Sequence, residues 1–175
     1  IDLVIIGPEE YLADGVSDYL QTKGIKTFGP IKKAAKLETS KSFAKSFLLK
    51  NKILTPKYRK FTTSNKALSY LNSLNFPVVI KADGLAAGKG VVICKNFSQA
   101  EQTIKLMMEK KKFGDAGKKI IIEEFIDGFE ISYFSFFDKK TFLPLGYALD
   151  HKRAFDNDLG PNTCLLYTSP SPRDQ

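Results

Sequence analysis

The chain has 175 residues, of which 43% are hydrophobic and 26% are charged. This composition is typical of a globular protein, and a chain of this length can bury roughly 70% of the surface that it exposes when unfolded. The net charge of +8 comes from 27 basic and 19 acidic residues, and lysines spread along the chain favour a solvated surface over a nucleic-acid site.

The sequence lacks the features of a membrane protein, a disulfide scaffold or a metal cluster. No run of about 18 apolar residues could span a bilayer, and residues 1–4 lack the basic start of a secretory signal. Cys94 and Cys164 are the only cysteines. We therefore expect a soluble, cytoplasmic protein without a membrane partner. The opening at Ile1 rather than Met indicates an excerpt of a longer chain.

The first 30 residues have the pattern of the end of a parallel α/β unit. Residues 2–6 form a short apolar run that predicts a strand, and residues 25–28 predict a second strand after Gly24. Between them, Leu12, Val16 and Leu20 share one face of a predicted helix. A strand, a helix and a strand in this order are typical of parallel sheets.

The next segment predicts helices and one extended stretch. Residues 34–51 have helical spacing and predict one helix, or two joined near Glu38, with Thr39 or Ser40 as a cap. Residues 57–61 are extended after Pro56. Ser64 is the expected cap of a further helix, which residues 75–77 end.

The second half of the chain predicts mainly strands. Residues 78–81 and 91–94 read as a hairpin, and Ser98 with Glu101 forms a capping-box pattern for a helix to about Lys110. Strands at residues 119–124, 130–137 and 141–148 predict an antiparallel meander, and residues 164–175 a disordered tail. The fold class is therefore α+β, with an α/β piece in front.

The hairpin tip at residues 81–90 is the most informative segment. Gly84, Gly88 and Gly90 leave backbone amides unobstructed, so the loop can close over phosphates. The spacing is neither that of a Walker A loop nor that of a dinucleotide-binding loop. Lys81 ends a rigid strand and suits the α and β phosphates, whereas Lys89 lies on the loop and suits the γ phosphate. The alternatives are an ordinary glycine turn and solvated lysines.

A second cluster lies at residues 120–130, where an apolar strand runs into an acidic linker. Such a linker can offer backbone groups to an adenine edge and a carboxylate to ribose hydroxyls. Glutamates near a turn are also commonly solvated, so both interpretations stay open.

Six strings in register make the chain similar to the phosphoribosylamine-glycine ligase (glycinamide ribonucleotide synthetase) family of the ATP-grasp superfamily. They are Gly7-Pro8-Glu9, Leu37-Glu38-Thr39-Ser40-Lys41 with Phe43-Ala44-Lys45, residues 81–90, Phe113-Gly114-Asp115-Ala116-Gly117, Glu123-Glu124-Phe125-Ile126-Asp127-Gly128, and Asp150-His151-Lys152-Arg153 with Gly160-Pro161-Asn162-Thr163. The resemblance runs from the first residues to Thr163 and implies a partial ATP-grasp domain at residues 31–163, after the end of a pre-grasp domain at residues 1–30.

The resemblance implies an ATP-dependent carbon-nitrogen ligase of purine synthesis. Glycine is activated by ATP as an acyl phosphate, and the amine of 5-phosphoribosylamine displaces phosphate. No protein nucleophile is needed, because phosphoryl transfer is catalysed by positioning and charge stabilisation.

The family pattern also assigns site residues. Lys41 and Lys81 would contact ATP phosphates, and the loop with Gly84, Gly88, Lys89 and Gly90 would cover them. Backbone groups of residues 123–126, with Glu123, Glu124 and Ile126, would bind adenine, and Glu130 would hold the ribose. The expected contacts to the other substrates are Gly7, Pro8, Glu9, Asp150, Lys152, Arg153 and Asn162.

The family's ligands for Mg²⁺, or Mn²⁺, lie in a second half of the fold, which this sequence does not continue into after Thr163. We therefore expect a monomeric fragment that is inactive alone and contributes no metal ligand. Three alternatives stay open: a biotin carboxylase-like or peptide ligase-like ATP-grasp enzyme, a lysine-rich nucleic-acid-binding module, and a non-functional translated fragment. Only three arginines occur, which disfavours the nucleic-acid module.

Overall fold

The computed structural model describes residues 1–86, 89–138, 140–155 and 159–167, the backbone alone at residues 150–154 and 159–167. The chain divides into two compact units, Ile1–Phe125 and Ile126–Gln175, and each is described by itself. Among the described residues, no helix is long and apolar enough to cross a bilayer.

The N-terminal part of the first unit is a small parallel α/β element. Strands β1 (Val4–Ile5) and β2 (Thr27–Phe28) pair in parallel, as the sequence predicts. The single predicted helix is instead two, α1 (Glu9–Asp14) and α2 (Val16–Thr22). Gly15 separates them, because its φ of 93° is left-handed and its N–H bonds back to the carbonyls of Leu12 and Tyr11.

Two further helices follow, and they meet at Ser40. Helix α3 (Lys32–Thr39) ends there, and α4 (Lys41–Lys50) begins, with the Ser40 hydroxyl accepting the Phe43 N–H. Of the two arrangements left open, the break into two helices is therefore the observed one, and Ser40 rather than Thr39 is the cap.

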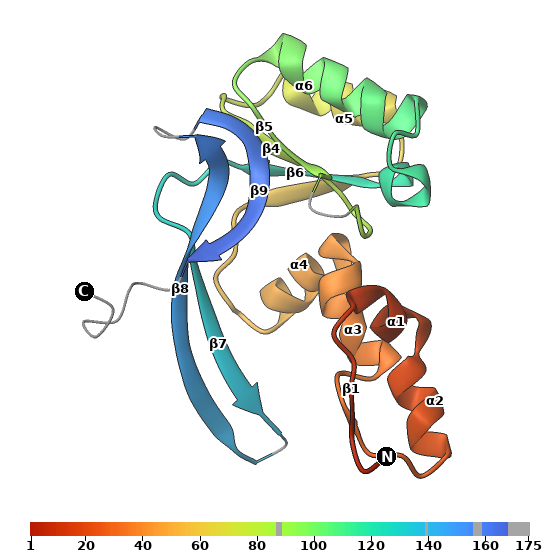
Figure 1. Ribbon diagram of the computed structural model, residues 1–175. Coiled ribbons are helices and arrows are strands. Elements are labelled where there is room, and N and C mark those ends of the chain that lie inside the picture. The colour runs from red at the N-terminus through yellow and green to blue at the C-terminus, as the bar shows by residue number, and fades with distance from the viewer. Residues whose placement is uncertain (87–88, 139, 156–158, 168–175) are drawn as a thin grey trace, which may run out of the picture. The chain divides into compact units, whose positions relative to one another are not determined.

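A four-stranded antiparallel sheet forms the rest of the first unit. Its order is β3 (Tyr58–Phe61), β6 (Ile120–Glu124), β4 (Val78–Ala82) and β5 (Val91–Cys94). Helices α5 (Ser64–Leu71) and α6 (Phe97–Ile104) lie side by side over one face of it (Figure 1). A π-helical turn, η1 (Lys105–Glu109), and a 3-10 helix, η2 (Gly114–Lys118), connect α6 to β6.

The core lies between this sheet and the two helices. Its fully buried members include Leu71, Ile80, Ile104, Met107 and Ile122. Alternate residues of β4 point to the helices, because side chains alternate along a strand. Burying each such side chain stabilises the fold by about 1.5–3 kcal/mol. The sheet is therefore a rigid platform for the residues on its other face.

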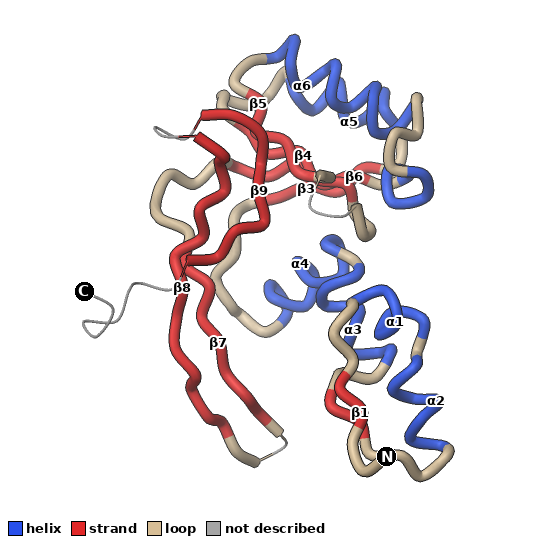
Figure 2. Tube along the Cα trace, viewed as in Figure 1, coloured by secondary structure: helices blue, strands red, loops and turns tan. Residues whose placement is uncertain are grey.

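The second unit is a three-stranded antiparallel sheet in the order β7 (Ile131–Phe137), β8 (Phe142–Phe155) and β9 (Leu159–Tyr167), drawn in red in Figure 2. The predicted meander is wrong in one respect, because β6 belongs to the first sheet. Its Ile120, Ile121 and Ile122 are all buried, as suits a central strand of that sheet. The α+β class is confirmed.

Two predicted caps are displaced. The residue before α5 is Thr63, so Ser64 is the first helical residue. Helix α6 is capped by Asn96, whose side chain accepts the Gln99 N–H, and Gln99 in turn accepts the Lys95 N–H. Glu101, expected to complete a capping box with Ser98, pairs with Lys105 at 2.7 Å instead.

The predicted tail also differs at its start. Residues 164–167 continue β9 through Tyr167, which pairs with Leu149 of β8. Apolar and aromatic residues favour strands, so Leu165, Leu166 and Tyr167 extend the pairing. The rest of the predicted tail, residues 168–175, lies outside the described residues.

Candidate functional site

A trio of charged residues, of which Lys45 and Glu123 are buried and Lys81 is half-buried, lies on the face of the four-stranded sheet opposite α5 and α6. The Lys81 Nζ lies 2.8 Å from Glu123 Oε2, and the Lys45 Nζ lies 3.1 Å from Glu123 Oε1. The Glu123 side chain is 2% exposed, that of Lys45 11%, and that of Lys81 27%. The Glu123 carboxylate thus pairs with a buried lysine, Lys45, and with a more exposed lysine, Lys81.

Strand register explains how these residues meet. Lys81 of β4 is opposite Ile121 of β6, and Glu123, two residues further on, is its diagonal neighbour on the same face. Tyr58 of β3 is directly opposite Glu123. Lys45 comes from α4, one helical turn after Lys41, so both lysines lie on the same side of that helix.

The Lys45 ammonium has several partners besides Glu123. Its Nζ donates to Thr55 Oγ1 at 2.7 Å and lies 5.7 Å from the centre of the Tyr58 ring. Burial lowers the pKa of Lys45, and the neighbouring Glu123 carboxylate opposes that shift. Within the described part of the chain, Glu123 Oε1 has no well-aligned hydrogen bond, so its ion pair with Lys45 is its main compensation.

Lys41, at the start of α4, is bound to the end of β4. Its N–H donates to the Asp83 carbonyl at 3.0 Å, and its Nζ donates to the Gly84 carbonyl at 3.2 Å. Burial lowers its pKa, although the carboxylates of Glu38 and Asp83 oppose that shift. A partly desolvated ammonium therefore lies at the entrance to the glycine-rich loop.

The Asp83 carboxylate fixes the same junction. It accepts the Ser42 N–H and the Ser40 hydroxyl, and it pairs with the Lys119 Nζ at 3.1 Å. Burial alone would raise the pKa of Asp83, but the hydrogen bonds from Ser42 and the charge of Lys119 outweigh it and hold the pKa below its usual value. Asp83 is therefore an ionised clamp between α4 and β4.

The glycine-rich loop joins β4 to β5, and this hairpin is confirmed. The Ala82 N–H donates to the Gly90 carbonyl at 2.8 Å. Both described ends of the loop are tightly packed: a Cβ on Gly84 would lie 2.9 Å from the Ala116 Cβ, and one on Gly90 2.6 Å from the Ala86 Cβ. Glycine is needed here for close backbone approach.

Two further residues of the loop, Lys89 and Gly88, were predicted to cover the phosphates. Lys89 is exposed, and its N–H donates to the Ala86 carbonyl at 2.9 Å. Gly88 lies outside the described residues.

The acidic segment at the end of β6 forms hydrogen bonds within the first unit. The Glu124 N–H donates to the Lys57 carbonyl at 3.0 Å, and the Lys57 N–H donates to Glu124 Oε1 at 2.7 Å. That N–H is therefore not available to a base. Ile126 and Glu130 are exposed and belong to the second unit, so the structure does not place them relative to Lys81.

The residues expected to contact the other substrates come from both units, and each group is described within its own unit. Gly7 and Pro8 precede α1, Pro8 is its N-terminal cap, and Glu9 is its first residue. Asp150, Lys152 and Arg153 lie on β8, and Asn162 on β9 is the backbone partner of Arg153. The register thus places two of the four C-terminal residues, Arg153 and Asn162, opposite each other on neighbouring strands.

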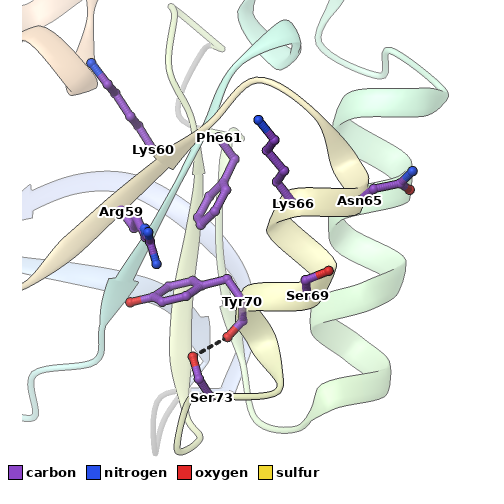
Figure 3. A pocket seen from close by; sticks show the side chains of 8 residues that line it. All are labelled: Arg59, Lys60, Phe61, Asn65, Lys66, Ser69, Tyr70 and Ser73. Carbon is purple, nitrogen blue, oxygen red and sulfur yellow. Dashed lines mark hydrogen bonds between the residues drawn. The ribbon is translucent and has the colours of Figure 1, made fainter.

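A separate cavity lies between β3 and α5. It has a volume of about 590 Å³ and is lined by Arg59, Lys60, Phe61, Asn65, Lys66, Ser69, Tyr70 and Ser73 (Figure 3). The Arg59 guanidinium lies 5.1 Å from the centre of the Tyr70 ring. Because side chains alternate along β3, Arg59 and Phe61 lie on the face opposite the one that Tyr58 shares with Glu123. This cavity is therefore separate from the trio.

A second cavity, of about 470 Å³, adjoins the base of the glycine-rich loop, where Asp83, Gly84, Ala116 and Lys119 contribute to its wall. Within the ranges that the structure describes, no three His, Cys, Asp or Glu side chains gather in a way that could hold a metal ion.

Sequence reasoning missed the structural partners of the site. It assigned no role to Lys45, Asp83 or Lys119, and it gave Glu123 to adenine rather than to two lysines. One signal was available, because Lys41 and Lys45 are four residues apart in a predicted helix. The contacts of Glu123 and Lys119 depend on strand register and could not be read from spacing.

Comparison with known proteins first shows the class of fold to which the chain belongs. A Bacillus anthracis D-alanine–D-alanine ligase solved in complex with ATP has the same fold, with a TM-score of 0.66 and 23% identity over 99% of this chain and 54% of that one. Residues 39–168 match the ATP-grasp (A) domain of phosphoribosylglycinamide synthetase. The trio therefore lies in an ATP-grasp fold.

The particular family follows from the rest of the chain. Residues 1–38 match the N domain of the same synthetase, and the chain belongs to the phosphoribosylglycinamide synthetase family. The phosphoribosylamine-glycine ligase of Clostridium acetobutylicum is 49% identical over 163 residues, which are 93% of this chain and 39% of that protein. The crystal structure of the Thermotoga maritima ligase has a TM-score of 0.72 and 33% identity over 93% of this chain and 39% of that one.

The chain spans about two fifths of the length of the curated relatives that it matches. The match to the N domain ends at residue 38, and the match to the ATP-grasp domain runs from residue 39 to residue 168. The expected boundaries, after residues 30 and 163, stay predictions.

Proposed function

We propose that this chain is the nucleotide-binding part of a phosphoribosylamine-glycine ligase. The whole enzyme would join glycine to 5-phosphoribosylamine through a glycyl phosphate and release ADP and phosphate. The observation that carries the proposal is the arrangement of Lys41 and Lys81 around the base of the glycine-rich loop, in a chain 49% identical to a ligase of that name.

The charge of the site suits phosphates. Among the described residues, the direct ion pairs of the four ammoniums of Lys41, Lys45, Lys81 and Lys119 involve only two carboxylates, those of Asp83 and Glu123, and the carboxylates of Glu38 and Glu124 act from further away. The excess positive charge is partly desolvated, and positive charge in such a setting stabilises the charge on a transferring phosphoryl group. Lys81 is fixed by a sheet strand and Lys41 by a helix start, so neither charge has to be repositioned when ATP binds.

The remaining predicted contacts complete the proposal. The loop with Gly84, Gly88, Lys89 and Gly90 would cover the phosphates. Residues 123–126 would meet the adenine through backbone groups other than the Glu124 N–H, and Glu130 the ribose. Gly7, Pro8, Glu9, Asp150, Lys152, Arg153 and Asn162 are proposed to contact glycine or 5-phosphoribosylamine.

The family uses Mg²⁺, or Mn²⁺, with ATP, and the metal would neutralise phosphate charge when bound. The described side chains include no group of three potential metal ligands, so we assign no ligand to them and expect the metal ligands in the second half of the fold. We further propose a monomeric, cytoplasmic enzyme that acts on small molecules and binds no nucleic acid.

A chimaera tests this function. The first 163 residues of this chain would replace the matching segment of the Clostridium acetobutylicum ligase, and ADP release would be measured with ATP and Mg²⁺. We expect release that requires both glycine and 5-phosphoribosylamine, and its loss in Lys81→Ala. A folded chimaera that instead requires bicarbonate or a D-amino acid would show another ATP-grasp enzyme, and a folded chimaera without ADP release would contradict the proposal.

A further inference from the structure

Lys45 is the least exposed of the lysines around the site, and the proposed function gives it no contact with ATP. Its ammonium is enclosed by Glu123 Oε1 at 3.1 Å, Thr55 Oγ1 at 2.7 Å and the Tyr58 ring. Its side chain is 11% exposed, against 27% for Lys81. A ligand on the open side of the sheet would therefore meet Lys81 and not Lys45.

The position of Glu123 between the two lysines explains why Lys45 affects the charge that Lys81 offers to a ligand. Its two carboxylate oxygens are divided between the two lysines, Oε1 toward Lys45 and Oε2 toward Lys81. With Lys45 absent, Lys81 and Glu123 would form a neutral pair, and both oxygens could turn to the one remaining ammonium. Lys81 would then offer less positive charge to an anion, because its charge would already be compensated.

We propose that Lys45 is a positioning residue for ATP phosphates, acting through Glu123 on Lys81. It holds one oxygen of Glu123 and leaves the trio with a net charge of +1, so that Lys81 is both fixed in place and still attractive to phosphate. This inference rests on the proposed function, because it assumes that Lys81 meets the phosphates.

Two substitutions isolate this role. Lys45→Met keeps most of the side-chain volume and removes the charge, and Lys45→Arg keeps the charge. Lys50→Met is the matched control, because Lys50 lies on the same helix and is exposed. Amide NMR titrations of the full 175-residue chain with MgATP and with adenosine would give both dissociation constants, and urea unfolding would check that each variant is folded.

The expected result is selective for phosphate. Lys45→Met should weaken MgATP binding about tenfold and change adenosine binding less than twofold, since one charged contact is altered and the base site is untouched. Lys45→Arg should recover most of the loss, and Lys50→Met should match the wild type. An equal loss for both ligands would indicate a merely structural role, and no loss would mean that Lys45 does not act on Lys81. Either result would overturn the inference.

A pH series covers the case in which Lys45→Met does not fold. Burial lowers the pKa of Lys45, and the groups that face its ammonium are Glu123, Thr55 and Tyr58, with Lys81 and Glu124 nearby. Between pH 7 and 10, MgATP affinity should fall earlier in the wild type than in Lys45→Arg, whose guanidinium stays charged. Superimposable pH profiles would contradict the inference. A wild-type chain that binds no MgATP would refute the proposed function itself, and the inference with it.

Discussion

The four-stranded sheet of the first unit and the three-stranded sheet of the second unit, here called the first and the second sheet, are built from similar strands but differ in what covers them. In the first sheet, Ile80 and Ile122 are 0% and 1% exposed under α5 and α6. In the second sheet, Tyr133 and Phe137 are 61% and 78% exposed. Close packing on a covered face fixes the side-chain geometry of the first sheet.

That difference explains where the charged trio lies. Lys81 and Glu123 come from the two central strands of the covered sheet, so their backbones are held by a packed core on the opposite face. A buried carboxylate between two lysines is stable only where the strand positions are fixed. The uncovered sheet offers paired backbone and exposed aromatic residues instead.

The largest difference between the two sheets is expected for a matched pair of side-chain truncations, one in each sheet. Ile122→Ala should lower the free energy of unfolding by about 2–5 kcal/mol, because it leaves a cavity in the packed core. Ile131→Ala removes the same atoms from a side chain that is 59% exposed and should cost less than about 1 kcal/mol. Urea unfolding followed by circular dichroism measures both. Similar losses would show that the second sheet has a core of its own.

Asp83 tests how firmly the covered sheet holds α4. Asp83→Asn should cost about 1–3 kcal/mol at pH 7, because it weakens charge-assisted hydrogen bonds at a buried junction. The folded-state pKa of Asp83 is held low, so its contribution is fully present above about pH 4 and is lost as the pH falls through the lowered value. The difference between wild type and variant in urea unfolding should therefore shrink toward pH 3. A difference that is independent of pH would contradict the assigned ionisation.

The base of the glycine-rich loop gives the smallest expected change. Gly90→Ala places a Cβ against Ala86 and Ala82 and should cost about 1–2 kcal/mol through overpacking. Gly7→Ala is the control, because a Cβ at Gly7 meets no atom within 4 Å. Thermal unfolding of the two variants would be compared. If Gly90→Ala is as stable as Gly7→Ala, the loop base is not packed as described.

The sequence predicted those parts of the fold that depend on local patterns. The β4–β5 hairpin and the apolar strand at residues 120–122 follow from residue types and spacing, and the break between α3 and α4 was one of the two arrangements that the sequence left open. The sheet that β6 joins and the pairing of Lys45 with Glu123 depend on contacts between distant segments, for which no local pattern exists. The observed caps, Thr63 and Asn96, lie one and two residues before the predicted ones, Ser64 and Ser98. Where several residues that can cap a helix lie close together, the sequence pattern does not distinguish between them.

The central claim is that Lys81 binds ATP phosphates from a fixed position on the covered sheet. The most direct measurement is MgATP affinity by calorimetry for Lys81→Ala and for Lys111→Ala, whose lysine is exposed after η1. The account predicts binding about ten- to a hundredfold weaker for Lys81→Ala, because a charged contact in a partly desolvated site is lost, and wild-type affinity for Lys111→Ala. Equal effects of the two substitutions would contradict it.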